Sequence, residues 1–406
     1  MEKKKVLLIA NYWHFEQEKA SSRYRKFADI LCEKYDLEVI TSTFCHLKKA
    51  QRNEAELGLN SLPYKVTMCY EKGYSKNISL KRIFSYTQFG KNVLKYLRTQ
   101  GKPDLIIVSV PSLAVADYVT SFARKNNIPV IVDIQDLWPE AFKMAINIPV
   151  ISDILFAPML WQANSIYKRA DVIMAVSDTY VKRGKQNNKS AEELSIYIGT
   201  DSQLVSDKIK GIEIEKPQDE FWVGYVGALG HSYDIEAVIN ALKILKQEKN
   251  CNNIVFYVMG DGVLREKFQQ HAKSQNVNCV FTGLLEYGKM MATLEKCDVA
   301  VNPIVGKSVS SIINKVSDYA AAGVPVVNTQ NSLEYRQLLE KTNSGISVEN
   351  GKEVDWNIAA AIYELYSKEE LRAEMAENSK KTFYEYFDRQ KTYPKLIDTI
   401  ERLINK

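Results

Sequence analysis

The sequence predicts an α/β protein of two domains, each built on a parallel sheet. Its 406 residues are enough for two domains of ordinary size. Short apolar runs of strand length alternate with segments of helical length in both halves, which favours βαβ units. A polar segment over 208–219, which contains Pro217, separates the two series and predicts a hinge. We therefore expect one domain over 1–207 and a second over 220–389.

The composition argues against a disulfide scaffold and against a metal centre. Six cysteines are scattered without a Cys-x-x-Cys pair, and four histidines are equally dispersed. The apolar run Val6–Ala10 is too short for the core of a signal peptide, and no segment approaches the length of a membrane-spanning helix. The expectation is a protein that is soluble or bound to a membrane surface.

Positive charge is concentrated in the first half. Residues 1–200 carry 29 Lys and Arg against 20 Asp and Glu, whereas 201–406 carry 25 against 29. Segment 71–102 has eight basic residues, one acidic residue and an apolar stripe at helical spacing. It could lie on an anionic membrane, or it could pack on its own sheet with its lysines in water. The apolar segment 144–163 is either a pair of core helices or a lip that touches lipid.

The first domain is expected to begin with the strand Val6–Ala10 and a helix over 21–35. This helix carries Arg23 and Arg25 behind small residues, which suits a phosphate, although a solvated basic face fits the same pattern. Strands are expected at 37–42, 105–110 and 129–134.

The strand at 129–134 leads into the polar turn Gln135–Glu140. Ligands of open parallel sheets bind beyond the carboxyl ends of the strands, so Asp136 is a candidate site residue. A packing corner formed by Trp138 and Pro139 is the alternative interpretation.

The second domain is expected to begin with a strand over 221–226 and a helix over 235–247. Between them, Gly227 and Gly230 would let the backbone approach a diphosphate, although this spacing alone is a weak signal. Two further strands, at 254–259 and 279–282, also end in glycines.

The stretch Val299–Val327 predicts one βαβ unit with a phosphate site. A strand ends at Asn302, and a loop of small residues leads to a helix for which Asn314 is a candidate N-cap. Free backbone N–H groups at the start of this helix, together with Lys315, would suit a phosphate. Asp318, one turn later, would suit a pair of ribose hydroxyls.

These motifs resemble glycosyltransferase family 4. The run Ala321–Val326 matches the small-residue tail of the family's donor signature, and Asp318 stands where its second Glu usually stands. Ser310 replaces the first Glu. The pairs Asn314-Lys315 and Asp318-Tyr319, together with the Asp-x-Trp-Pro-Glu pattern at 136–140, resemble a subgroup that builds bacterial surface polysaccharides. Gln135 replaces a histidine of many members, so no His base is expected there.

The resemblance implies a GT-B fold of two Rossmann-like domains that face each other across a cleft, with a C-terminal helix over 390–406 crossing back to the first domain. It also implies a retaining glycosyltransferase that uses a nucleotide sugar, with a UDP-sugar as the first choice. The acceptor would be a polyprenyl-diphosphate-linked saccharide in capsule, O-antigen or exopolysaccharide assembly. We expect no metal and no cofactor, and a cytoplasmic protein peripheral to the inner face of the membrane.

The resemblance also assigns roles to residues. Lys315 would meet the diphosphate, Asp318 the ribose, and Asp136 the acceptor. In the family an Arg and a Lys follow the first glycine, and here Ala228 and Tyr233 stand instead. The other expected substrate-binding residues are Gly227, Ala228, Leu229, Gly230, His231, Gly260, Gly262, Gly283, Leu284, Ser310, Ser311, Ile312, Ile313, Asn314, Arg23, Arg25, Gln135 and Trp138.

Two alternative functions stay open. A nucleotide-sugar 2-epimerase shares the fold and would act without an acceptor. A non-catalytic partner subunit of a glycosyltransferase complex would explain the missing Glu at Ser310 and the missing basic pair.

Overall fold

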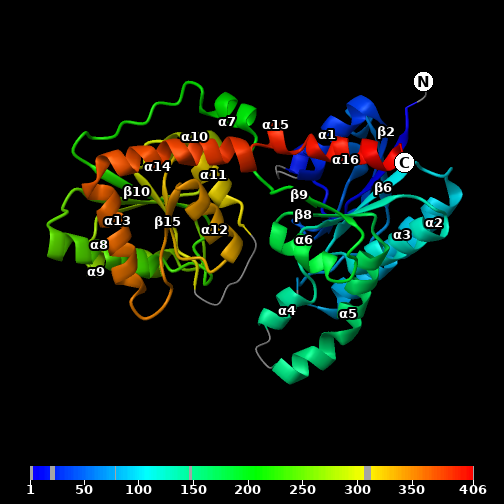
Figure 1. Cartoon of the computed structure of the whole chain (residues 1–406), viewed down its shortest axis with the longest axis horizontal. Coiled ribbons are helices and arrows are strands. Elements are labelled where there is room, and N and C mark those ends of the chain that lie inside the picture. The colour runs from blue at the N-terminus through cyan, green and yellow to red at the C-terminus, as the bar shows by residue number, and fades with distance from the viewer. Residues whose placement is uncertain (1–2, 19–22, 78, 146–148, 306–311, 406) are drawn as a thin grey trace. The chain divides into compact units, whose positions relative to one another are not determined.

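The computed structural model describes residues 3–18, 23–77, 79–145, 149–305 and 312–405. The chain divides into two compact units (Figure 1). The first unit comprises Met1–Ile196 together with Tyr393–Lys406, so the C-terminal segment belongs to the same unit as the N-terminus. The second unit is Tyr197–Thr392.

The first unit is built on a parallel sheet of seven strands among the residues that the structure describes, in the order β5-β2-β1-β6-β7-β8-β9. Its strands are β1 Lys5–Ile9, β2 Asp36–Ser42, β5 Lys65–Cys69, β6 Leu105–Val110, β7 Val130–Ile134, β8 Val172–Ala175 and β9 Glu192–Ser195, and a small hairpin pairs β3 Phe44–Cys45 with β4 Ala50–Gln51.

Helices cover both faces of this sheet because alternate residues of each strand point to opposite sides. In β1, Leu7 and Ile9 join a core with α2, α3, α5 and α6, whereas Val6 and Leu8 join a core with α1 and α16. The helices are α1 Arg23–Lys34, α2 Leu80–Thr99, α3 Leu113–Lys125, α4 Glu140–Ala145, α5 Pro149–Arg169, α6 Asp178–Lys185 and α16 Lys395–Ile404.

The second unit repeats the plan with a parallel sheet of six strands within the described ranges, in the order β12-β11-β10-β13-β14-β15. These are β10 Phe221–Val226, β11 Ile254–Met259, β12 Cys279–Gly283, β13 Val299–Asn302, β14 Val326–Asn328 and β15 Gly345–Ser347.

The helices of the second unit pack on this sheet in two groups. One core joins it to α8, α9 and α13, and another joins it to α7, α10 and α11. The helices are α7 Ser202–Ile209, α8 Ile235–Lys249, α9 Arg265–Ser274, α10 Tyr287–Leu294, α11 Lys315–Ala322, α12 Leu333–Thr342, α13 Val354–Ser367, α14 Glu369–Thr382 and α15 Arg389–Thr392, with a π-helical turn at Phe383–Phe387 between the last two.

The structure confirms the α/β class and the parallel sheets, and it adds strands that the sequence did not predict. β5 and β15 are edge strands, and β9 is the edge strand at the other end of the first sheet. Their residues are only partly buried, so they lack the continuous apolar run that marks a central strand.

The apolar segment 144–163 is not a pair of core helices. It falls on the end of α4, on residues 146–148, which lie outside the described part, and on α5, a helix of 21 residues. Ile154, Leu155 and Trp161 of α5 are exposed. Among the described residues, no helix has both the length and the apolar character needed to cross a membrane.

Candidate functional site

In the second unit, the turns that follow β10 and β11 pack backbone against backbone. The N–H of Gly227 donates to the carbonyl of Met259 at 3.0 Å, and that of Leu229 donates to Asp261 at 2.9 Å. A Cβ on Gly260 would lie 1.9 Å from the carbonyl oxygen of Gly227, so only glycine fits there. Gly262 is equally confined by the backbone of Leu229.

This packing fixes an accessible turn at the carboxyl edge of the sheet. Ala228 and His231 are exposed, and Gly230 is half-buried. Leu229 is fully buried, so its side chain anchors the turn rather than facing a ligand. The turn then enters α8, whose N-cap Asp234 accepts a hydrogen bond from the N–H of Ala237 at 3.1 Å.

Lys315 is the first residue of α11, and its side chain extends to Gly227 in this turn. Its side chain is buried, and its Nζ lies 4.1 Å from the ring centre of Tyr225 and 3.7 Å from that of Tyr233. A Cβ on Gly227 would lie only 2.6 Å from this Nζ. Glycine at 227 therefore makes room for the amine, and the two rings hold it.

The Lys315 amine has no hydrogen-bond partner among the described residues. Its burial lowers the pKa of Lys315 well below the ordinary lysine value of 10.5. Two aromatic faces stabilise an ammonium only in part, because they supply no countercharge. An anion bound at the glycine turn would supply it. This arrangement defines a candidate anion site.

Asp318 lies one turn further along α11 and is already hydrogen-bonded. Its Oδ1 accepts from the hydroxyl of Thr200 at 2.8 Å and from that of Tyr287 at 2.9 Å. Burial raises the pKa of Asp318, whereas these two hydrogen bonds oppose that shift. Both hydrogen bonds recorded for this carboxylate among the described residues fall on Oδ1.

The start of α11 differs from the sequence prediction in one respect. Asn314 stands at the N-cap position, but its backbone is helical and its side chain makes no capping hydrogen bond. Asn314 is exposed, Ile313 is half-buried and Ile312 is packed in a core with Val316 and residues of α12. The expected contacts of Ser310 and Ser311 lie outside the described residues.

Gly260 and Gly283, two of the expected substrate-binding residues, lie where β11 and β12 end. Gly283, with φ of +72°, pairs with Gly260 through an isolated β-bridge. Arg265 donates to the carbonyl of Phe281 at 3.3 Å and to Asp261 Oδ2 at 3.2 Å. Leu284 is 82% exposed and is thus available to stack on a ligand.

In the first unit, the turn after β7 is fixed by its own side chains. The indole Nε1 of Trp138 donates to Asp136 Oδ2 at 3.1 Å, and Trp138 is buried. Gln135 donates instead to the fully buried Asp133 at 2.9 Å. Burial raises the pKa of Asp136, which the hydrogen bond from Trp138 and the charge of Arg82 oppose.

The two arginines expected to meet a phosphate each have an acidic neighbour within the first unit. The guanidinium of Arg23 is buried, lies 3.8 Å from Asp133 and stacks over the ring of Phe27, but none of its nitrogens makes a hydrogen bond with the described residues. Arg25 forms an ion pair with Glu16 at 3.0 Å.

A polar aromatic cluster beside Trp138 was missed in the sequence. Arg82 donates to the hydroxyls of Tyr86 at 2.8 Å and Tyr12 at 2.5 Å, and it stacks 4.5 Å from the Trp138 ring. Tyr86 also hydrogen-bonds to Tyr74, which contacts His46. Burial and nearby cations lower the pKa of His46 to about 4, so this imidazole is neutral near pH 7. Tyr12 and Tyr74, which follow the carboxyl ends of β1 and β5, are the sequence signal that could have indicated this cluster.

Two parallel Rossmann-like sheets with this arrangement of helices form the GT-B fold. Sucrose-phosphate synthase from Thermosynechococcus elongatus superposes with a TM-score of 0.70 at 14% identity, over 99% of this chain and 100% of that one. HepE from Anabaena, solved in complex with UDP, superposes with a TM-score of 0.69 at 15% identity, over 98% of this chain and 100% of that one. WaaG, a glycosyltransferase involved in lipopolysaccharide biosynthesis, superposes with a TM-score of 0.61 at 14% identity, over 98% of this chain and 99% of that one.

The family comparison concerns the second unit. Residues 220–368, from β10 through α13, match the family described as Glycosyl transferases group 1. A comparison with curated proteins returns no match. The glycine turns, Lys315 and Asp318 all lie inside the matched segment.

We predict that Lys315→Met stabilises the ligand-free protein at neutral pH by about 1–3 kcal/mol, because it removes a buried polar group without a partner. Thermal unfolding would measure the gain, and the exposed lysine change Lys289→Met is the control. Burial lowers the pKa of Lys315 in the folded state, so the unfolded state binds more protons between that lowered pKa and 10.5, and wild-type stability rises with pH in this window. The gain should therefore shrink as the pH rises toward 10.5. A destabilised Lys315→Met protein would show that the amine is satisfied.

Proposed function

We propose that the protein is a retaining glycosyltransferase that moves a sugar from a UDP-sugar to a lipid-linked saccharide during assembly of a surface polysaccharide. The observation that carries the proposal is the buried, unpartnered Lys315 amine beside the Gly227 turn, within the segment that matches Glycosyl transferases group 1. The UDP bound to HepE and the lipopolysaccharide role of WaaG support the choice of donor and pathway.

The chemistry needs a stabilised leaving group more than a strong base. As the bond between sugar and diphosphate breaks, negative charge grows on the diphosphate. Lys315 would be protonated and paired by that charge. The backbone N–H groups of Ala228, Gly230 and Lys315, which donate to no recorded partner among the described residues, would add hydrogen bonds. Asp318 Oδ2 would accept from the ribose hydroxyls. Asp136 would lie beside the acceptor hydroxyl, and metal is not required in this scheme.

We predict that UDP raises the thermal unfolding temperature more than GDP or ADP does, and that EDTA does not remove the effect. The reason is that Lys315 and backbone donors meet the diphosphate without a cation. A thermal-shift series with each nucleotide, with and without EDTA, would measure this. Stronger stabilisation by GDP would overturn the choice of UDP, and loss of the shift in EDTA would contradict metal independence.

We predict that Lys315→Ala weakens UDP binding at least tenfold, whereas the exposed control Lys289→Ala leaves it unchanged. Asp318→Asn should weaken UDP binding but leave inorganic diphosphate binding nearly unchanged, because the carboxylate faces ribose. Calorimetric titration with UDP and with diphosphate would separate the two effects. Unaltered UDP affinity in Lys315→Ala would place the phosphate charge elsewhere.

Turnover separates this function from its alternatives. A 2-epimerase would release UDP and free sugar without an acceptor, and a non-catalytic subunit would bind nucleotide without consuming it. Incubation with UDP-sugars, with and without a lipid-linked saccharide, followed by mass spectrometry, would distinguish the three.

We also propose that the first unit docks on the anionic inner face of the cell membrane, as a cytoplasmic peripheral protein. Leu80, Ile83 and Phe84 are exposed at the start of α2, among the cations of segment 71–102. Exposed Leu155 and Trp161 on α5 add apolar surface. Each cation near such a leaflet contributes roughly 1 kcal/mol to the free energy of membrane binding, and salt screens this attraction beyond a Debye length.

We predict that the protein co-sediments with liposomes containing anionic lipid and is released by salt. Leu80→Ser with Ile83→Ser should weaken the binding, and Lys91→Glu with Lys95→Glu should weaken it by removing favourable charge. Val263→Ser, which changes an exposed apolar residue of the second unit, is the matched control. Arg82 is left intact because it is bonded to Tyr12 and Tyr86. A wild-type protein that stays in the supernatant at low salt would refute the membrane docking.

A further inference from the structure

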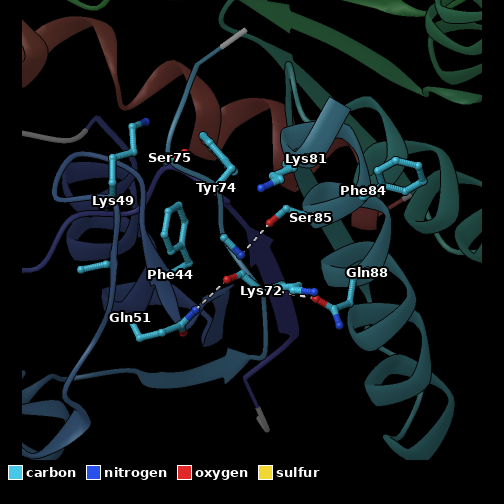
Figure 2. Close-up of a pocket in the computed structure, with 12 residues that line it drawn as sticks. Phe44, Lys49, Gln51, Lys72, Tyr74, Ser75, Lys81, Phe84, Ser85 and Gln88 are labelled. Carbon is cyan, nitrogen blue, oxygen red and sulfur yellow. Dashed lines mark hydrogen bonds between the residues drawn. The ribbon is translucent and has the colours of Figure 1, made fainter. Parts of the chain in front are cut away.

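The first unit contains a cavity of about 660 Å³ beyond the carboxyl ends of β2 and β5. Its walls come from the β3–β4 hairpin, from the loop after β5 and from the first turns of α2 (Figure 2). Neither the donor-site residues nor Asp136 line it. It is therefore separate from the candidate sites described above.

The charge of this cavity is wholly positive. Lys49, Lys72 and Lys81 line it, and no Asp or Glu is among the lining residues. Figure 2 shows the Lys81 side chain directed toward Tyr74. The described residues provide no ion-pair partner for these three amines; the Nζ of Lys49 lies 3.2 Å from the neutral ring of His46. Lys49 is half-buried and Lys72 and Lys81 are exposed, and no carboxylate stands beside them among the lining residues, which favours an anionic ligand.

The acidic residue nearest to them does not neutralise this charge. Glu71 precedes Lys72 in the chain, but its side chain is buried and accepts a hydrogen bond from the Ser85 hydroxyl at 2.7 Å. Burial raises its pKa. Glu71 therefore bonds to Ser85 of the cavity wall and is not itself a lining residue.

Hydrogen bonds and close packing fix the wall of the cavity without a ligand. The N–H of Gly73 donates to Ser85 Oγ at 2.9 Å, and that of Lys72 donates to Gln88 Oε1 at 2.9 Å. Gln51 donates to the carbonyl of Lys72 at 3.2 Å (Figure 2). Gly73 has φ of +84°, and a Cβ there would lie 2.3 Å from the ring of Phe44. Such preorganisation lowers the entropic cost of binding.

One side of the cavity is apolar and open to solvent. Phe84 lines it while remaining 72% exposed, and Leu80, in the turn before, is equally exposed. A small inorganic anion would use the lysines but leave these side chains in water. A ligand that joins an anionic group to a hydrocarbon would use both.

We propose that this cavity binds the phosphate or diphosphate of a lipid-linked acceptor, with the first part of its hydrocarbon chain on Phe84 and Leu80. The proposal rests on the proposed function, because it assigns the acceptor's phosphate to a defined place. Binding here is non-covalent, and it would hold the acceptor by the part that every lipid-linked saccharide shares.

The test is calorimetric titration with farnesyl diphosphate and with inorganic diphosphate, both in saturating UDP so that the donor site is filled. The variant Lys49→Gln/Lys72→Gln/Lys81→Gln should bind farnesyl diphosphate at least tenfold more weakly. The control Lys91→Gln/Lys95→Gln/Lys189→Gln has the same change in net charge and should bind like wild type. Phe84→Ser should weaken farnesyl diphosphate several-fold and leave inorganic diphosphate unchanged.

Equal affinity of the cavity variant and the wild type, or no binding by the wild type, would overturn the proposal. Equal affinity for the two ligands would overturn its lipid part and leave a site for free phosphate. The UDP-induced thermal shift is measured on the same variants. Farnesyl diphosphate binding without a UDP shift would contradict the proposed function alone, and a UDP shift without farnesyl diphosphate binding would contradict the cavity assignment alone.

Discussion

The buried amine of Lys315 constrains the whole carboxyl edge of the second sheet. An ammonium taken out of water needs a countercharge, and the described residues offer only the faces of Tyr225 and Tyr233. Gly227 has to lack a side chain for the amine to fit, and Gly260 has to lack one for the carbonyl of Gly227 to fit. The glycines at 227 and 260 therefore let the two turns pack around the Lys315 amine.

The two units use the same edge of their sheets in different ways. In the second unit β10 and β11 lead into Gly227 and Gly260, and β12 ends at Gly283, so their backbones pack closely at this edge. In the first unit they end in bulky polar and aromatic side chains, such as Tyr12 and Trp138, that bond to one another. A backbone edge suits a diphosphate, which is the same in every donor, whereas a side-chain edge suits an acceptor whose shape varies. This difference supports the division of roles proposed above.

The sequence was sufficient for the fold because central parallel strands are apolar on both faces and leave continuous runs such as 105–110 and 221–226. It was insufficient for edge strands such as β9, which are only partly buried. The position of Lys315 could be predicted from the helix start, but its aromatic surroundings could not, since Tyr225 and Tyr233 come from another strand and loop. The same holds for Arg82, one of the eight basic residues of segment 71–102. Its contacts with Tyr12 and Trp138 could not be predicted, because these residues lie in distant segments of the chain.

The ring of Tyr233 under the Lys315 amine also limits how this site can change over evolutionary time. A lysine at position 233 would bring a second ammonium toward the first, with no aromatic face left between them. Replacing Lys315 alone would instead leave an empty space between the rings of Tyr225 and Tyr233. The lysine and its rings therefore depend on one another, and a replacement at one of these positions changes which residues the other positions can accept.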